Sequence, residues 1–102
     1  MEEILLQLKK QKEKYLQEGF IIVGLSGSYA RGDADATSDI DIVYEIDYDR
    51  YLKKYSGWKS FLHLDSIKQE LQEYFQKNID LVNKNHLSKT AQKYILKDLK
   101  YV

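Results

Sequence analysis

Two aspartates separated by one residue are the strongest candidates for chemistry in this sequence. Asp39 and Asp41 alternate with Ile40 and Ile42 at the start of an apolar stretch. Side chains of a β-strand alternate between its two faces, so we expect both carboxylates on one side, with Cα atoms about 6.6–6.8 Å apart. Carboxylates this close repel each other, and a divalent cation that prefers oxygen ligands relieves the repulsion. The pair therefore predicts a site for a hard cation such as Mg²⁺.

A third aspartate stands in a similar apolar setting. Asp80 follows Ile79 and precedes Leu81 and Val82, in a short stretch typical of a strand. If that strand lies beside the one that carries Asp41, three carboxylates converge. Three carboxylates around one or two Mg²⁺ ions are the arrangement with which phosphoryl-transfer sites bridge attacking and leaving oxygens.

A glycine-serine turn precedes the aspartate pair. Gly27 and Ser28 follow a buried apolar run and open a short predicted helix that contains Arg31. Backbone N–H groups at such a turn favour phosphate, and glycine permits close approach of the backbone. The Ser28 hydroxyl is suited to donate to a phosphate oxygen. Arg31 is suited either to neutralise phosphate charge or to hold the acidic loop that follows.

Other interpretations of these residues fit the sequence less well. Taken singly, a Gly-Ser pair is usually only a turn, and an Asp-x-Asp pair is often loop chemistry. A calcium-binding EF-hand loop starting at Asp33 fails, because its sixth position is Ser38 rather than glycine and its twelfth is Tyr44 rather than glutamate. A Walker phosphate loop fails because no Gly-Lys-Ser/Thr follows, and the glycines before the turn do not form a dinucleotide fingerprint.

The remaining pattern supplies elements to hold these residues. Apolar periodicity predicts helices over about 2–18 and 59–77, and buried strands over 20–25, 39–46 and 78–83. Ser88 is expected to cap a last helix that buries Ala91, Tyr94, Ile95 and Leu99. The order αβαβαβα predicts an α/β (α+β) fold, a small mixed β-sheet flanked by helices.

Composition limits the class of protein. The 102 residues predict one domain over 1–102. The charges of sixteen basic and sixteen acidic residues cancel, so the composition gives no evidence of a basic surface that binds nucleic acid. The longest apolar run, six residues from Phe20 to Leu25, is too short to span a membrane. With no cysteine and no leader segment, we expect a cytoplasmic protein.

Together these residues resemble the nucleotidyltransferase superfamily that includes DNA polymerase beta. The signature of that superfamily is Gly-Ser, about ten residues, and then Asp-x-Asp. Here Gly27-Ser28, the ten residues 29–38 and Asp39-Ile40-Asp41 match it, and Asp80 is the natural match for the third carboxylate on a later strand. The resemblance implies the nucleotidyltransferase fold, a triphosphate bound at Gly27 and Ser28, and two Mg²⁺ ions on the three aspartates.

The short chain is similar to the stand-alone minimal nucleotidyltransferases. These resemble antitoxins paired with a small helical HEPN ribonuclease toxin, onto a tyrosine of which the antitoxin transfers AMP from ATP. The resemblance thus implies a HEPN toxin partner, ATP as substrate, and a homo- or hetero-oligomer as a possible state. Two alternatives stay open at this point: a non-catalytic module that neutralises a toxin by covering it, and a small-molecule transferase like the aminoglycoside-modifying relatives.

Overall fold

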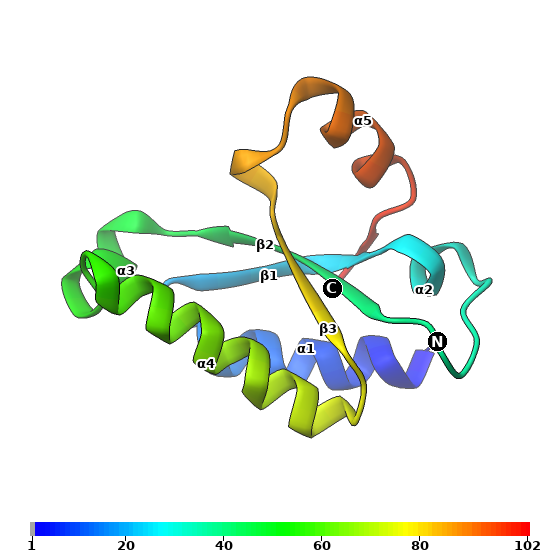
Figure 1. Ribbon diagram of the computed structural model, residues 1–102, viewed down its shortest axis with the longest axis horizontal. Helices are drawn as coiled ribbons and strands as arrows, with labels where there is room; N and C mark the ends of the chain where they lie inside the picture. Colours follow the sequence, from blue (N-terminus) through cyan, green and yellow to red (C-terminus); the bar gives the residue numbers. More distant parts are fainter. Residues whose placement is uncertain (1) are drawn as a thin grey trace.

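The computed structural model describes residues 2–102 and contains one four-stranded sheet with helices on its faces (Figure 1). The expected α/β (α+β) class is confirmed. In chain order the elements are α1 (Glu2–Leu16), β1 (Phe20–Ser26), α2 (Gly27–Arg31), β2 (Ile40–Ile46), α3 (Tyr48–Lys54), α4 (Trp58–Phe75), β3 (Ile79–Asn83), the 3-10 helix η1 (Lys84–His86), α5 (Lys89–Lys97) and β4 (Lys100–Tyr101).

The sheet is mixed, with strand order β3-β2-β1-β4. Strand β1 runs antiparallel to both β2 and β4, whereas β2 and β3 are parallel. Parallel neighbours need a long crossover, and α3 and α4 supply it between β2 and β3. Figure 1 shows α1 and α4 along one side of the sheet, while α5 stands off beyond the far end of β3.

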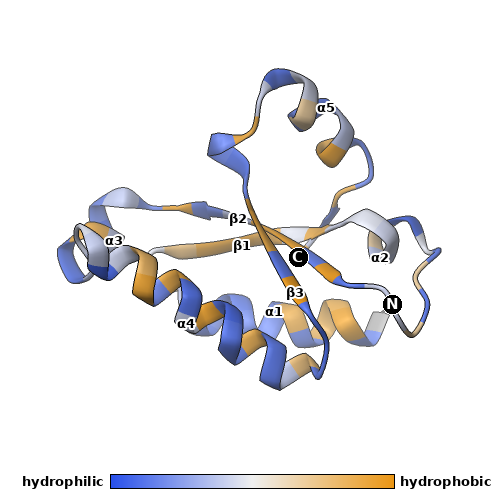
Figure 2. Cartoon of the chain, viewed as in Figure 1, coloured by the Kyte–Doolittle hydropathy of each residue, from blue (hydrophilic) through white to orange (hydrophobic). Residues whose placement is uncertain are grey.

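One face of the sheet forms the hydrophobic core. Along β2 the side chains of Ile40, Ile42, Tyr44 and Ile46 are buried; of the residues between them, Asp41 and Glu45 are partly exposed and Val43 is buried. Figure 2 shows that apolar residues predominate along β1 and β2. The helices contribute a matching set of buried side chains from α1 and α4: Leu8, Tyr15, Ile67 and Leu71. Burial of these apolar groups fixes which face of β2 points away from the helices.

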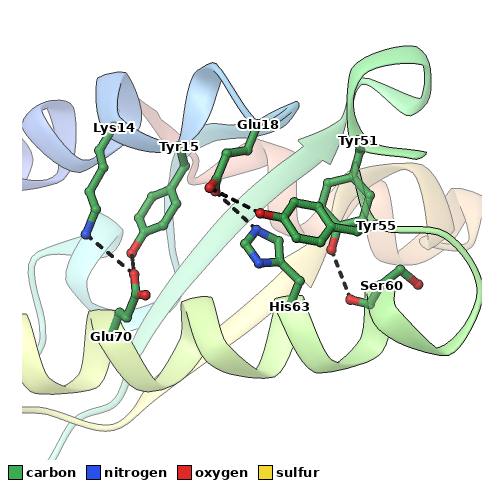
Figure 3. A network of polar contacts seen from close by, with 8 residues as sticks. All are labelled: Lys14, Tyr15, Glu18, Tyr51, Tyr55, Ser60, His63 and Glu70. Atoms are coloured by element: carbon green, nitrogen blue, oxygen red, sulfur yellow. Dashed lines mark hydrogen bonds and ion pairs between the residues drawn. The ribbon is translucent and has the colours of Figure 1, made fainter. Parts of the chain in front are cut away.

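A polar seam along the same helices fixes α4 against α1 (Figure 3). The hydroxyl of Tyr15 donates to Glu70, and burial together with this carboxylate raises the pKa of Tyr15. At the other end of the seam, Glu18 contacts His63 at 3.1 Å and accepts from the Tyr55 hydroxyl at 3.4 Å. The rings of Tyr55 and His63 stack with centroids 3.6 Å apart.

Strand β4 was not expected from the sequence. It pairs with β1 opposite Gly24 and Leu25, and a Cβ on Gly24 would overlap the Lys100 carbonyl. Only glycine allows this close approach. The expected helix over 2–18 ends at Leu16, and the residues that follow form a turn closed by a Gly19 N–H to Leu16 hydrogen bond.

The last helix is capped as expected but packs differently. The Ser88 side chain accepts a hydrogen bond from the Ala91 N–H at 3.1 Å. The prediction that Tyr94 is buried is wrong: its side chain is 73% exposed, because α5 lies away from the core and has no buried residue. Of the helices in residues 2–102, none is both long enough and apolar enough to cross a membrane.

Two leucines of α4 test this packing. Leu71 is fully buried and Leu62 is 58% exposed, so they compare one residue type in one helix. We expect Leu71→Ala to lower the free energy of unfolding by about 2–5 kcal/mol, because it removes buried apolar atoms and leaves a cavity. Leu62→Ala is expected to change it by less than about 0.5 kcal/mol. Urea denaturation measures both, and equal losses would contradict the described core.

Candidate active site

Three neighbouring strands place polar side chains in one row on the sheet face opposite the core. In the register of the sheet, Ser26 of β1 is opposite Asp41 of β2, and Asp41 is opposite Asp80 of β3. Residues opposite each other in adjacent strands point to the same face, about 4.8 Å apart. Asp41 is partly exposed and Asp80 exposed. The structure therefore brings together two of the three predicted carboxylates, side by side.

Asp39 lies at the edge of this row. It was expected inside the second strand, but β2 begins at Ile40, and Asp39 is an exposed residue of the preceding loop. The backbone of Ile40 is held on the neighbouring segment by a hydrogen bond to the Asn78 carbonyl. The negative charge of Asp39 still acts on Asp41, and contributes to raising its pKa.

The proximity of the carboxylates changes the acidity of Asp41. Its pKa is raised from 3.8 to about 6, first by burial and then by the charge of Asp80 and a side-chain hydrogen bond with it. Arg31 acts in the opposite direction. Because two adjacent carboxylates resist ionising together, this pair favours either a proton or a cation between them.

The glycine turn packs directly against this pair. Gly27 begins α2 with φ +69°, and a Cβ at this position would overlap the Asp41 carboxylate. Ser26, before it, is buried, and its backbone is extended as the N-cap of α2. The first backbone N–H groups of α2, at Gly27 and Ser28, thus start beside Asp41. The helix ends at Arg31 and is capped by Gly32, whose N–H donates to the Ser28 carbonyl at 3.0 Å.

The loop between α2 and β2 is held by its own side chains. Arg31 pairs with Asp33 at 3.2 Å, so of its two expected roles the structure contains the one that holds the acidic loop. Asp35 accepts from both the backbone N–H and the hydroxyl of Thr37, and these bonds lower its pKa. Ser38 closes the turn by accepting from the Asp35 N–H at 2.9 Å. This turn leads directly into Asp39.

Lys77 is a residue of this region that sequence analysis did not find. Its ammonium donates to the Ala36 carbonyl at 3.2 Å and lies 5.9 Å from the centre of the Tyr29 ring. It thereby ties the segment before β3 to the loop and to α2. No sequence pattern marks such a long-range contact. By contrast, Asp35, Thr37 and Ser38 have the residue types of an Asx turn, a signal that was available.

The donor set suits a hard cation. Asp41 and Asp80 offer adjacent carboxylate oxygens, the ligands that Mg²⁺ prefers, and their mutual repulsion is the property that such an ion removes. Within residues 2–102, however, no group of three or more His, Cys, Asp or Glu side chains is already arranged to hold a metal ion. The pair is formed, and Asp39 must turn toward it to complete the expected three ligands.

Comparison with known proteins identifies the family. Residues 6–102 match the nucleotidyltransferase domain family. The chain belongs to this family. "Putative protein adenylyltransferase MJ0126" of Methanocaldococcus jannaschii is 35% identical over 100% of this chain and 94% of that protein. "Protein adenylyltransferase MntA" of Thermococcus cleftensis is 31% identical over 88% of this chain and 84% of that protein.

Two solved structures share the fold. "Structure of putative minimal nucleotidyltransferase" superposes with a TM-score of 0.68 at 22% identity, covering 96% of this chain and 95% of that one. "Crystal structure of the toxin-antitoxin with AMP-PNP" gives a TM-score of 0.56 at 21% identity, covering 81% of this chain and 60% of that one. The four-stranded mixed sheet of this nucleotidyltransferase is therefore the nucleotidyltransferase fold that its sequence predicts.

The carboxylate pair predicts a pH-dependent gain of stability in Asp41→Asn. Because the pKa of Asp41 in the folded protein is about 6, above its ordinary 3.8, ionisation of this group favours the unfolded chain. The penalty is absent below about pH 4, grows up to about pH 6 and is complete above it. At pH 8 in EDTA, the variant is expected to be more stable by about 1 kcal/mol, after allowance for solvent screening.

Urea denaturation at pH 4 and pH 8 measures this difference. Asp65→Asn on α4, an exposed aspartate whose hydrogen bond is to Gln69 of the same helix, is the matched control and should show no such gain. An Asp41→Asn protein that is no more stable than the wild type at pH 8 would contradict the repulsion described here.

Proposed function

We propose that this nucleotidyltransferase is a Mg²⁺-dependent antitoxin that transfers AMP from ATP to a tyrosine hydroxyl of a HEPN ribonuclease toxin. The observation that carries the proposal is the pairing of Asp41 with Asp80 on an open sheet face, in contact with the glycine turn at Gly27. Charged oxygens for a metal and backbone N–H groups for phosphate thus lie side by side. Both are needed to hold a metal-bound triphosphate.

In the proposed site, Gly27 and Ser28 bind the triphosphate through the start of α2 and the Ser28 hydroxyl. Arg31, exposed and one turn later, neutralises phosphate charge when it leaves Asp33. Asp39, Asp41 and Asp80 would hold one or two Mg²⁺ ions. Bound there, Mg²⁺ supplies charge neutralisation on the attacking and leaving oxygens.

The reaction proceeds by attack on the α-phosphorus. The acceptor hydroxyl oxygen forms the new P–O bond, the bond to the β-phosphate breaks, and pyrophosphate leaves. We propose that Asp80, which is exposed at the end of the row, takes the hydroxyl proton. The product is a phosphodiester between AMP and the acceptor.

An open site supports a macromolecular acceptor. A broad polar hollow beside the loop, lined by Gln69, Gln72, Glu73, Gln76, Lys77 and Asn78, contains none of the three carboxylates. These carboxylates lie instead on an exposed sheet face, where a partner protein can form the other wall. The relatives named as protein adenylyltransferases, and a fold neighbour described as a toxin-antitoxin with AMP-PNP, support a toxin as this partner.

The test is co-expression with a candidate HEPN toxin, followed by intact mass spectrometry of the toxin. We expect additions of one AMP unit each, located on tyrosine by fragmentation. Each of Asp39→Asn, Asp41→Asn and Asp80→Asn should lower transfer at least about a hundredfold, because each removes a metal-binding charge. Asp65→Asn, remote on α4, is the matched control and should retain wild-type transfer.

Two outcomes would overturn this proposal in different ways. If the toxin is neutralised in a stable complex but stays unmodified with ATP and Mg²⁺ present, the protein is a covering module. If the aspartate variants transfer AMP normally, the residues assigned to the site are wrong even though the reaction occurs.

A further inference from the structure

The first half of α4 exposes large apolar side chains on one helix face. Trp58, Phe61 and Leu62 are 69%, 75% and 58% exposed, and their spacing of three and four residues places them together on the helix. Figure 2 shows the apolar segments in this part of α4. Scattered exposed apolar residues are normal, but three on one helix face form a patch that marks an interaction site.

The core does not require this patch. Helix α4 is already anchored by the fully buried Ile67 and Leu71 further along. Near its start, the Tyr51 hydroxyl donates to the Ser60 carbonyl at 2.9 Å and fixes the helix to α3. Other residues therefore hold α4 in place, and the exposed side chains of Trp58, Phe61 and Leu62 are available for another contact.

Lysines flank these apolar side chains. One surface hollow is lined by Lys54, Tyr55, Trp58, Lys59, Leu62 and His63. Within residues 2–102 neither Lys54 nor Lys59 forms an ion pair with an acidic side chain. From Leu52 to Leu62 the sequence contains three lysines, Lys53, Lys54 and Lys59, and no acidic residue, so this segment carries a local positive charge. We call Lys54 and Lys59 with Trp58, Phe61 and Leu62 the α4 docking surface.

We propose that the α4 docking surface binds an acidic amphipathic helix of a partner protein. Apolar side chains of that helix pack on Trp58, Phe61 and Leu62, and flanking carboxylates pair with Lys54 and Lys59. A second copy of this chain is a poor occupant, because it would bring lysines against lysines. A single-stranded nucleic acid is also a poor occupant: Trp58 and Phe61 could stack on its bases, but the zero net charge of the chain gives little attraction for its phosphates.

This inference goes beyond the proposed function. The surface contains none of the three carboxylates, Gly27 or Ser28, and binding there requires no nucleotide transfer. Aromatic side chains at the centre of an interface carry much of its affinity, so Trp58 and Phe61 are the expected anchors of this contact.

Trp58 is the only tryptophan in the chain, so its fluorescence reports on this surface directly. The probe is a synthetic tryptophan-free helical peptide with leucines at positions i, i+3, i+4 and i+7 and glutamates between them. We expect a saturable blue shift of Trp58 emission that weakens at high salt. The same peptide with lysine in place of glutamate should bind roughly tenfold more weakly or worse.

Two variants with a matched control complete the test. Phe61→Ser should weaken binding of the acidic peptide roughly tenfold. The control, Leu6→Ser, changes a leucine of α1 that is 64% exposed and should leave binding unchanged. The double variant Lys54→Glu, Lys59→Glu should reverse the preference, so that the lysine peptide binds better. Thermal melts verify that each variant is folded, and the charge reversal is informative even if Phe61→Ser is destabilised.

Four results would overturn the inference. Equal binding of both peptides would indicate unspecific apolar adhesion, and no shift with either would leave no docking surface. A larger shift with a single-stranded oligonucleotide would assign the surface to nucleic acid. Self-association that Phe61→Ser abolishes would assign it to a second copy. None of these results depends on AMP transfer, so the proposed function can stand or fail separately.

Discussion

The repulsion between two carboxylates held in register is the constraint on which the rest of this structure depends. Parallel pairing of β2 with β3 places Asp41 and Asp80 opposite each other, and burial together with the charge of Asp80 raises the pKa of Asp41 to about 6. The register is fixed from the other face of the sheet, where Ile40 and Ile79 are buried opposite each other. A slip by one residue would expose those isoleucines, so hydrophobic burial stabilises an electrostatically unfavourable arrangement.

The other elements of the fold hold Asp41 and Asp80 in position on an open face of the sheet. The crossover through α3 and α4 allows β3 to run parallel to β2. The polar seam between α1 and α4 fixes the position of α4. Gly27 is glycine because the Asp41 carboxylate occupies the space of a Cβ. Close approach of a phosphate, the reason inferred from sequence, stays a prediction. Helices α1 and α4 lie along one side of the sheet, and the carboxylates lie on the opposite face.

Sequence analysis predicted the parts that local patterns encode. Alternation placed Asp41 away from the core, the apolar setting of Asp80 predicted its strand, and Ser88 caps α5 as its residue type favours. It failed where the cause is distant in the chain. Strand β4 has two residues and no pattern of its own, and it depends on Gly24 across the sheet. Lys77 joins three segments, and Tyr94 is exposed because α5 lies away from the core.

The most direct test of the central claim is the melting temperature with ATP in the presence of Mg²⁺ or of EDTA. If the adjacent carboxylates need a cation before they accept a triphosphate, ATP with Mg²⁺ stabilises the protein by about 2.7 kcal/mol at a hundredfold excess over Kd, and ATP with EDTA does so far less. In Asp80→Asn, where the pair has lost one charge, the difference between the two conditions should shrink. Equal shifts in Mg²⁺ and in EDTA would contradict a metal-bridged site at Asp41 and Asp80.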